Sequence, residues 1–354
     1  MGGSHEQEIR DGRWGLRTDR YSRSVDRRIS HVRRDFCPVL SGVLGVRLLP
    51  WRSEMKDLNR RVALCEDLKK LYPGFILGPL SLRVTYGSVI GLFGPNGSGK
   101  TTLLLMLLGL VRPTEGRALF PLANVSASME STGLLGDVTV SDYLSATAGA
   151  VSRGGVENDV ARTCGIASYM NTKVRHLSMG NRQRLTIALM LVEDADLMVF
   201  DEPLNGLDPE GIRWFSTVLR SLKGRGKTVI LSSHLLQEVE LFIDACIFLR
   251  EGQLLYDGKF SQLRTLLAER LRVLVPDSPS EAVDDTSCWQ KYRFAHDDGR
   301  RIVVDPETET DSGAPDAKYH LGAVDGATLS LQTAYAWLSY QFETNGVGGW
   351  DQPR

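Results

Sequence analysis

Residues Gly94–Thr101 read G-P-N-G-S-G-K-T and fit the phosphate-loop pattern G-x-x-x-x-G-K-[ST]. The apolar run Ser88–Phe93 precedes them and predicts a buried strand, and the leucine-rich segment Thr102–Leu108 predicts a helix. A glycine-rich turn between a strand and a helix directs successive backbone N–H groups at one point, where the helix N-terminus adds about half a positive charge. A chance turn that contains a lysine would lack this context. The stretch therefore predicts an α/β phosphate-loop fold that binds a nucleotide.

Four side chains in two segments give this site its expected chemistry. The pattern predicts that Lys100 reaches the β- and γ-phosphates and that the Thr101 hydroxyl ligates Mg²⁺. The segment Leu197–Glu202 consists of four apolar residues followed by two carboxylates. A buried strand that brings Asp201 to the edge of a sheet can hold Mg²⁺ beside the loop, and Glu202 can polarise an attacking water. Such a strand is common and by itself is weak evidence for a nucleotide site. After a phosphate loop it becomes strong evidence.

The composition excludes several classes of protein. The chain has 354 residues, of which 42% are hydrophobic and 24% charged, as in an ordinary globular protein. Its net charge of −1 gives no overall attraction to nucleic acid or anionic lipid. Five cysteines without a C-x-x-C pair indicate neither a disulfide framework nor a zinc site. The longest apolar run, Leu103–Val111, is half the length of a membrane span, and we expect no secretory signal peptide.

The chain divides into three expected regions. Residues 1–54 carry eleven Arg, no Lys and seven acidic residues with poor apolar periodicity, which indicates a disordered extension or a mis-annotated start, with a regulatory arm as the alternative. Residues 55–267 form the expected nucleotide-binding domain. Residues 268–354 form a C-terminal accessory region, whose stretch 276–318 has eleven acidic and five basic residues and is expected to be a solvated face or loop.

Short strands and helices alternate between residues 60 and 267, which is the α/β pattern. The expected strands are Val62–Cys65, Ser81–Val84, Ser88–Phe93, Leu197–Phe200, Thr228–Ser232 and Cys246–Leu249, followed in the C-terminal region by Arg270–Val275 and Arg301–Val304. The expected helices are Thr101–Leu110, Arg182–Val192, Glu210–Leu222, Leu235–Phe242 and, in the C-terminal region, Leu329–Phe342. The strand signal disappears at about 138–176. Because Thr139–Asp142 resembles a capping box there, we expect a mostly helical insert.

A third segment, Leu177–Asn181, places Ser178 and Gly180 at the start of an expected helix. A helix N-terminus that is opened by small residues can bind an anion. The alternative is a simple N-cap serine followed by a turn glycine.

Together these segments resemble the ABC ATPase family, specifically the nucleotide-binding subunits of ABC transporters. Gly94–Thr101 is similar to the Walker A loop, Leu177–Asn181 to the signature sequence L-S-G-G-Q, and Asp201-Glu202 to the Walker B aspartate and catalytic glutamate. Asn205–Asp208 is similar to the D-loop and His234 to the switch histidine. The motifs occur in the order and spacing of the family, and the resemblance covers about residues 60–267. It implies a P-loop NTPase core with a helical insert subdomain, completed here by a small C-terminal α+β extension.

The resemblance also implies roles for individual residues. Tyr72 would stack on adenine, with Phe75 as a nearby alternative, Thr102 would assist Thr101, and Asp208 would couple two active sites. The implied catalytic residues are Glu202, His234, which would contact the γ-phosphate, and Lys100, and the implied Mg²⁺ ligands are Thr101, Glu130 and Asp201. The implied ATP contacts are Tyr72, Gly94, Pro95, Asn96, Gly97, Ser98, Gly99, Lys100, Thr101, Thr102, Ser178, Gly180 and Asp208.

Two features depart from the family pattern. Glu130 stands where the family has its Q-loop glutamine; it can still ligate Mg²⁺, and an exposed loop carboxylate is the alternative. Met179 and Asn181 replace a glycine and a glutamine of the signature, while the two residues that approach phosphate remain.

The family resemblance further implies the partners. Each ATP would lie between the Walker A loop of one subunit and the signature of another, so this single cassette would form a homodimer or a heterodimer. We expect an integral membrane permease as the second partner, no nucleic acid, a cytoplasmic location on the inner face of the cell membrane, and transport in the direction of export. Two alternatives stay open: a soluble, non-transport ABC ATPase that acts on DNA or ribosomes, and a catalytically weak binding subunit of a heterodimer.

Overall fold

The computed structural model describes residues 61–118, 124–129, 133–276, 294–297, 302–305 and 319–345. All of these residues belong to one compact unit, Val39–Arg354. The expectations for residues 1–54, for Glu130 and for most of the acidic stretch 276–318 lie outside the described residues.

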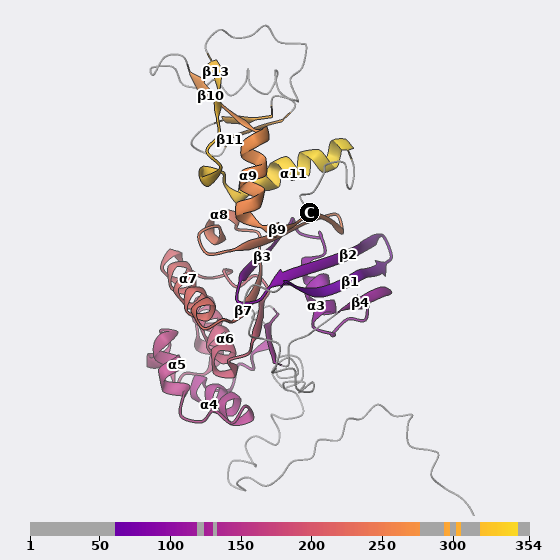
Figure 1. Ribbon diagram of the computed structural model, residues 1–354. Helices are drawn as coiled ribbons and strands as arrows, with labels where there is room; N and C mark the ends of the chain where they lie inside the picture. The colour runs from indigo at the N-terminus through magenta and orange to yellow at the C-terminus, as the bar shows by residue number, and fades with distance from the viewer. Residues whose placement is uncertain are drawn as a thin grey trace, which may run out of the picture. The chain divides into compact units, whose positions relative to one another are not determined.

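A six-stranded sheet, in the order β5-β6-β7-β3-β8-β9, carries four of the strands predicted for the nucleotide-binding region. Figure 1 labels β3, β7 and β9 of this sheet. The strands are β3 (Val89–Phe93), β5 (Val125–Ser128), β6 (Leu197–Phe200), β7 (Thr228–Ser233), β8 (Ala245–Arg250) and β9 (Gln253–Lys259). Neighbours from β5 to β8 are parallel, and β9 is antiparallel to β8. Every residue of β3, β6 and β7 is buried, because a continuous apolar run suits a strand that is covered on both faces. The prediction of a mixed α/β fold is confirmed.

Alternate residues of these strands enter two different hydrophobic cores. Val199 of β6 packs in a core with Leu103 of α3 (Lys100–Leu107). The next residue, Phe200, packs in the other core with Phe215 of α7 (Pro209–Gly224), the two ring centroids lying 5.5 Å apart in a T-shaped arrangement. The sheet is therefore held between α3 on one face and α7 on the other.

A three-stranded antiparallel sheet, in the order β2-β1-β4, packs in the same core as α3. Its strands are β1 (Arg61–Tyr72), β2 (Phe75–Thr85) and β4 (Glu115–Ala118). The predicted strands Val62–Cys65 and Ser81–Val84 are short pieces of β1 and β2. Both strands are much longer because they form a hairpin that pairs as far as Tyr72 and Phe75, and cross-strand hydrogen bonds continue where apolar alternation stops. Strand β4 was not predicted, because this short edge strand is mostly exposed and has no apolar face.

The helix that follows the phosphate loop is shorter than expected. It was predicted to extend to Leu110, but α3 ends at Leu107 with Leu108 as its C-cap. Gly109 adopts a left-handed conformation with φ of 71°, and the N–H group of Leu110 turns back to the carbonyl of Leu105. A left-handed glycine ends a helix in this way because it has no Cβ to clash.

Helices form the insert predicted at about 138–176 and continue from it towards β6. They are α4 (Val140–Ala150), α5 (Glu157–Thr163), two 3₁₀ turns (Ala167–Tyr169 and Val174–His176) and α6 (Met179–Glu193). Thr139 is the N-cap residue of α4, as its place in the expected capping box requires: its hydroxyl accepts a hydrogen bond from the Asp142 N–H group at 3.1 Å and donates one to the Asp142 carboxylate at 2.8 Å. The local sequence therefore sets the start of this helix.

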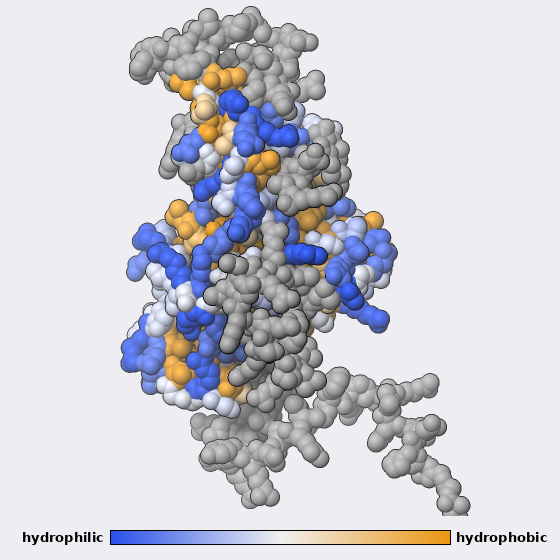
Figure 2. Space-filling view, in the orientation of Figure 1, coloured by the Kyte–Doolittle hydropathy of each residue, from blue (hydrophilic) through white to orange (hydrophobic). Residues whose placement is uncertain are grey.

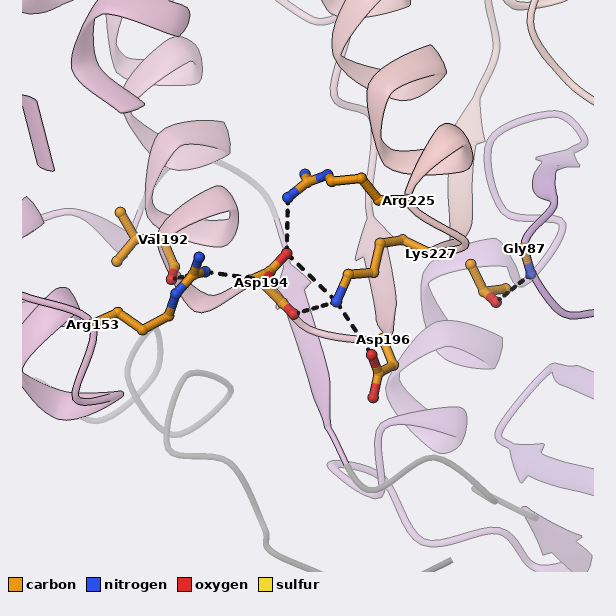
Figure 3. A network of polar contacts seen from close by, with 8 residues as sticks. Gly87, Arg153, Val192, Asp194, Asp196, Arg225 and Lys227 are labelled. Atoms are coloured by element: carbon orange, nitrogen blue, oxygen red, sulfur yellow. Dashed lines mark hydrogen bonds and ion pairs between the residues drawn. The ribbon is translucent and has the colours of Figure 1, made fainter. Parts of the chain in front are cut away.

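A network of ion pairs holds the end of α6 (Figure 3). Asp194, the C-cap residue of α6, has a left-handed φ of 53°. Its carboxylate lies 3.5 Å from Arg153, which follows α4, and 3.0 Å from Arg225, the C-cap residue of α7. Lys227 adds a hydrogen bond of 2.7 Å to the Asp194 carbonyl and an ion pair of 3.2 Å to Asp196. One residue thereby connects the helical segment to α7 and to the start of β7.

The C-terminal α+β extension predicted from the sequence consists of a four-stranded sheet, in the order β11-β12-β10-β13, and the helix α11. Its elements are β10 (Arg272–Pro276), β11 (Ala295–Asp297), β12 (Ile302–Val304), β13 (Tyr319–Ala323) and α11 (Leu331–Asn345). The predicted boundary between residues 267 and 268 lies inside a helix, α9 (Phe260–Arg270), which the sequence analysis missed together with β5 and β9. Trp337 is fully buried in the same core as Phe248 of β8, so the extension packs directly on the nucleotide-binding fold.

The segment after β7 also differs from its prediction. A helix was expected at Leu235–Phe242, but α8 covers only Leu236–Val239. The N–H group of Phe242 bonds to the carbonyl of Val239, three residues back, because the chain turns there into β8.

Hydrophobic and hydrophilic side chains are interspersed on the face shown in Figure 2. In the described part of the chain, each helix falls short of the length and apolar character that crossing a bilayer requires.

Candidate nucleotide-binding site

The phosphate loop connects the buried strand β3 to α3, and Gly99 is the N-cap residue of the helix. Gly99 has a φ of 101°, and a Cβ atom at this position would lie 2.7 Å from Cδ1 of Leu77. Only glycine therefore fits here without strain. No side chain caps α3, and its first turn carries no acidic residue. The amide groups at this helix start are thus left to an external anion, which is the property that a phosphate site requires.

Lys100 is bound to its own loop. Its side chain is almost fully buried, and its Nζ donates hydrogen bonds to the Gly94 carbonyl at 2.8 Å and the Pro95 carbonyl at 3.3 Å. Burial lowers the pKa of this ammonium group, while the negative charges of Glu202 and Asp201 oppose the change. A partly desolvated cation held only by neutral carbonyls is well placed to gain from an incoming phosphate.

Asp201 brings together the loop and two strands. It follows β6 directly and is 5% exposed. One carboxylate oxygen accepts a hydrogen bond from the Thr101 hydroxyl at 3.0 Å, and the other accepts one from the Ser232 hydroxyl of β7 at 2.5 Å. Two of the three predicted Mg²⁺ ligands therefore lie side by side. Their donors are a hydroxyl and a carboxylate oxygen, which fit Mg²⁺. In the described part of the chain, no group of three or more His, Cys, Asp and Glu residues could hold a metal by itself, so a metal at this place would need further oxygens from a nucleotide or water.

Glu202 and His234 form a pair beside this carboxylate. Nδ1 of His234 lies 2.8 Å from Oε2 of Glu202, although the two residues are far apart in the sequence. Glu202 has a left-handed φ of 50°, a conformation that is strained for its residue type and that turns the chain at the end of β6. Its N–H group donates a hydrogen bond of 2.8 Å to the hydroxyl of Ser232. The expected base and the expected switch histidine thus meet at one point.

Ser232 is the residue of this site that sequence reasoning missed. It is completely buried in β7, and its hydroxyl bridges the Asp201 carboxylate and the Glu202 backbone. The signal was present in Leu231-Ser-Ser-His234, where a polar residue closes an apolar strand immediately before a polar site, but Ser232 was predicted only as the last residue of the strand Thr228–Ser232.

The signature residues and Asp208 have structural roles within this chain. Ser178 is the N-cap residue of α6, and its hydroxyl accepts a hydrogen bond from the Asn181 N–H group at 3.2 Å. Asp208 caps α7 in the same way, through the Gly211 N–H group at 2.6 Å. Gly180 lies against the D-loop, where a Cβ atom would come within 2.9 Å of the Gly206 carbonyl oxygen. The predicted contacts of Ser178 and Gly180 with ATP stay predictions, as does the coupling role of Asp208.

The expected adenine contact lies at the turn of the β1–β2 hairpin. Tyr72 is 40% exposed, and Nζ of Lys70 lies 5.4 Å from its ring centroid. Phe75 lies against the phosphate loop, since its ring carbon Cζ would be 3.2 Å from a Cβ atom on Gly99. Stacking on adenine by Tyr72 or by Phe75 stays a prediction.

These features define an α/β nucleotide-binding protein of the P-loop class. The family model described as ABC transporter matches residues 77–205. The lantibiotic transport ATP-binding protein SrtF of Streptococcus pyogenes is 33% identical over 209 residues, which cover 54% of this chain and 90% of SrtF. Nod factor export ATP-binding protein I of Burkholderia orbicola is 33% identical over 265 residues, which cover 69% of this chain and 87% of that protein.

The fold also has solved counterparts. A structure described as the ATP-binding subunit of an ABC transporter superposes with a TM-score of 0.54 at 24% identity, covering 58% of this chain and 93% of that one. The chain belongs to the family of ABC transporter ATP-binding proteins. It is accordingly an ATP-binding protein and an ATP hydrolase of the ABC type.

Proposed function

We propose that this chain binds and hydrolyses ATP to power a separate membrane permease, in the direction of export. The observation that carries the proposal is the meeting of Asp201, Thr101 and Ser232 beside the pair of Glu202 and His234. Transport is supported by the names of two relatives, which state lantibiotic transport and Nod factor export, and the second name also supports the direction of export. The chain would then lie on the cytoplasmic face of the membrane and be held there by the permease.

In the proposed reaction, the residues of this chain act mainly by positioning and by charge. Lys100 exchanges its two loop carbonyls for phosphate oxygens, and the free amides at the start of α3 bind the same oxygens. Bound Mg²⁺, held by Thr101 and Asp201, would neutralise phosphate charge. Glu202, held by His234, orients the attacking water and accepts its proton.

A second subunit completes the proposed site. Ser178 and Gly180 stand at the start of α6, where small residues leave the backbone accessible to the phosphates bound by a partner. Met179, between them, is 56% exposed, which is unusual for a large apolar side chain and suits a surface that another subunit covers. Asp208 would couple the two sites of a homodimer or heterodimer.

The two alternatives have less support. A soluble ABC ATPase that acts on DNA or ribosomes has no support in the names of the two relatives described above. A catalytically weak binding subunit is disfavoured because Lys100, Asp201, Glu202 and His234 are all present and His234 contacts Glu202.

Replacing Glu202 with glutamine tests the proposed chemistry. The variant should bind ATP with the affinity of the unmodified chain but turn it over about a hundredfold more slowly or worse, since glutamine keeps the size of the side chain and cannot accept the proton. ATPase assays and titration with a fluorescent ATP analogue measure the two quantities. The Lys100→Ala variant is the counterpart that should lose binding itself. Unchanged turnover in Glu202→Gln would remove Glu202 from the role of base.

Purification of the tagged full chain from native membranes tests the proposed partners. A co-purifying membrane-spanning protein is expected, and its loss on detergent exchange should release a chain that still binds ATP. Recovery with ribosomes or DNA, and with no membrane protein, would contradict the proposal.

A further inference from the structure

The switch histidine is followed within six residues by a carboxylate that the proposed reaction does not use. Glu240 is the C-cap residue of α8, the short helix that begins two residues after His234. Its side chain is only 16% exposed, so its charge must be compensated by other groups.

Both oxygens of this carboxylate are bound by elements that come much later in the chain. One oxygen accepts a hydrogen bond from the Arg264 guanidinium of α9 at 2.5 Å. The other accepts one from the Leu331 N–H group, in the first turn of α11, at 2.9 Å. The positive end of α11 adds to the stabilisation, because an acidic side chain is favourable at a helix N-terminus.

Arg264 connects the same partners a second time. Its Nε donates a hydrogen bond to the carbonyl of Leu329, just before α11, at 2.8 Å, and its guanidinium carbon lies 4.2 Å from the centroid of the Phe260 ring. An arginine fixed by a stacked ring and two acceptors holds Glu240 in one geometry.

Apolar contacts support the polar ones. Val239 and Phe242, on either side of Glu240, are buried in the core cluster that also contains Leu331 and Leu338 of α11. Gln237 of α8 adds a hydrogen bond of 2.8 Å to Gln332. The segment after His234 is therefore attached to the C-terminal extension along its length, whereas the His234 side chain is itself about half exposed.

We propose that Glu240 is a positioning residue: by docking on Arg264 and the start of α11, it fixes the segment that holds His234 against Glu202. The inference rests on the proposed function, because it assigns Glu240 an effect on turnover through the pair of His234 and Glu202. It gives the C-terminal extension a part in the reaction, since the two groups that bind Glu240 come from α9 and α11.

The test uses the full-length chain with Glu240→Gln, which keeps the side-chain size and an acceptor for α11 but removes the charge that Arg264 binds. Turnover of ATP should fall about tenfold while nucleotide affinity stays within about twofold, because a small displacement of a catalytic group lowers the rate without loosening the substrate. Arg264→Gln lies outside the segment that follows His234 and should lower ATP turnover to the same extent. The matched control is Glu238→Gln on the exposed side of α8, which should behave like the unmodified chain.

A double-mutant cycle separates positioning from general destabilisation. In a His234→Ala background, Glu240→Gln should change turnover by less than about twofold, since the residue it positions is gone. Equal losses in both backgrounds would indicate a merely structural role and overturn the inference. Histidine-selective labelling gives a second readout: of the six histidines, the NMR signal that His234→Ala removes should shift or broaden in Glu240→Gln.

The outcomes keep the two proposals distinguishable. If ATP turnover depends on His234 but is unchanged in Glu240→Gln and Arg264→Gln, the inference alone is overturned. A chain without ATP turnover in any background would overturn the proposed function, and an unchanged His234 signal would then overturn the inference independently.

Discussion

Replacing the buried Glu193 with glutamine is expected to remove a pH-dependent destabilisation of the folded chain. Glu193 is the last residue of α6 and is 7% exposed. Burial raises the pKa of its carboxyl from 4.5 to about 7, and the nearby Ser126 hydroxyl offsets only part of that increase. Neither the Ser126 hydroxyl nor Oε1 of Glu193 has a hydrogen bond of good geometry to any described residue, so desolvation is the dominant cause.

The sign and size follow from the two pKa values. The folded chain holds this proton more tightly than the unfolded chain, so its contribution to stability is full below pH 4.5 and is lost as the pH rises towards 7. The complete loss is about 3.4 kcal/mol, at about 1.4 kcal/mol per pKa unit. About 2.5 kcal/mol of it should appear between pH 5 and pH 8, since part has already been lost at pH 5.

Urea unfolding at pH 5 and at pH 8 measures this effect. The free energy of unfolding of Glu193→Gln, minus that of the unmodified chain, should increase by about 2.5 kcal/mol from the lower to the higher pH. Other titrating groups are common to both proteins and cancel in the difference. The exposed Glu269→Gln is the control, and its difference should stay constant within about 0.5 kcal/mol. A difference for Glu193→Gln that is equally constant would refute the argument that desolvation governs this carboxyl.

Three further substitutions probe separate parts of the structure. Asp194→Asn keeps a residue that tolerates the left-handed conformation but removes the negative charge from the ion-pair network. The free energy of unfolding should therefore fall by about 1 kcal/mol, and 1 M salt should abolish the difference from the unmodified chain. Trp337→Phe removes the indole N–H group that donates to the buried Asp305 carboxylate at 2.9 Å, and should lower the unfolding free energy by about 1–3 kcal/mol; an unchanged urea midpoint would show that this bond contributes nothing. Gly180→Ala should push the Gly206 carbonyl away. ATP turnover should fall by more than the accompanying loss of thermal stability explains. Full activity would mean that the two loops can separate freely.

Much of the nucleotide site could be predicted because its determinants are local. The phosphate loop needs glycine where no Cβ fits, as at Gly99, and needs a lysine and a hydroxyl at fixed distances along the chain. Strand β6 was predicted with its exact bounds because four apolar residues in a row suit a strand buried on both faces. The roles assigned to Tyr72, Ser178, Gly180 and Asp208 stay predictions.

Elements without a local signal were missed or misjudged. The short edge strand β4 is polar, and its place depends on pairing with β1. The helix α9 crosses a predicted domain boundary, because one core continues from the sheet into the C-terminal extension. The expected helix Leu235–Phe242 was too long because the turn into β8 competes with helical hydrogen bonds.

The sequence by itself determined the family of this protein and the residues proposed to bind phosphate, ligate a metal and accept a proton, since each motif lies within a few consecutive residues. The tertiary structure decided which of these groups meet. The contact of Glu202 with His234, the bridge that Ser232 forms to Asp201, and the docking of Glu240 on α11 join residues from different strands and helices. Their distances are set by strand order and core packing, which depend on the whole chain and on no single stretch of it.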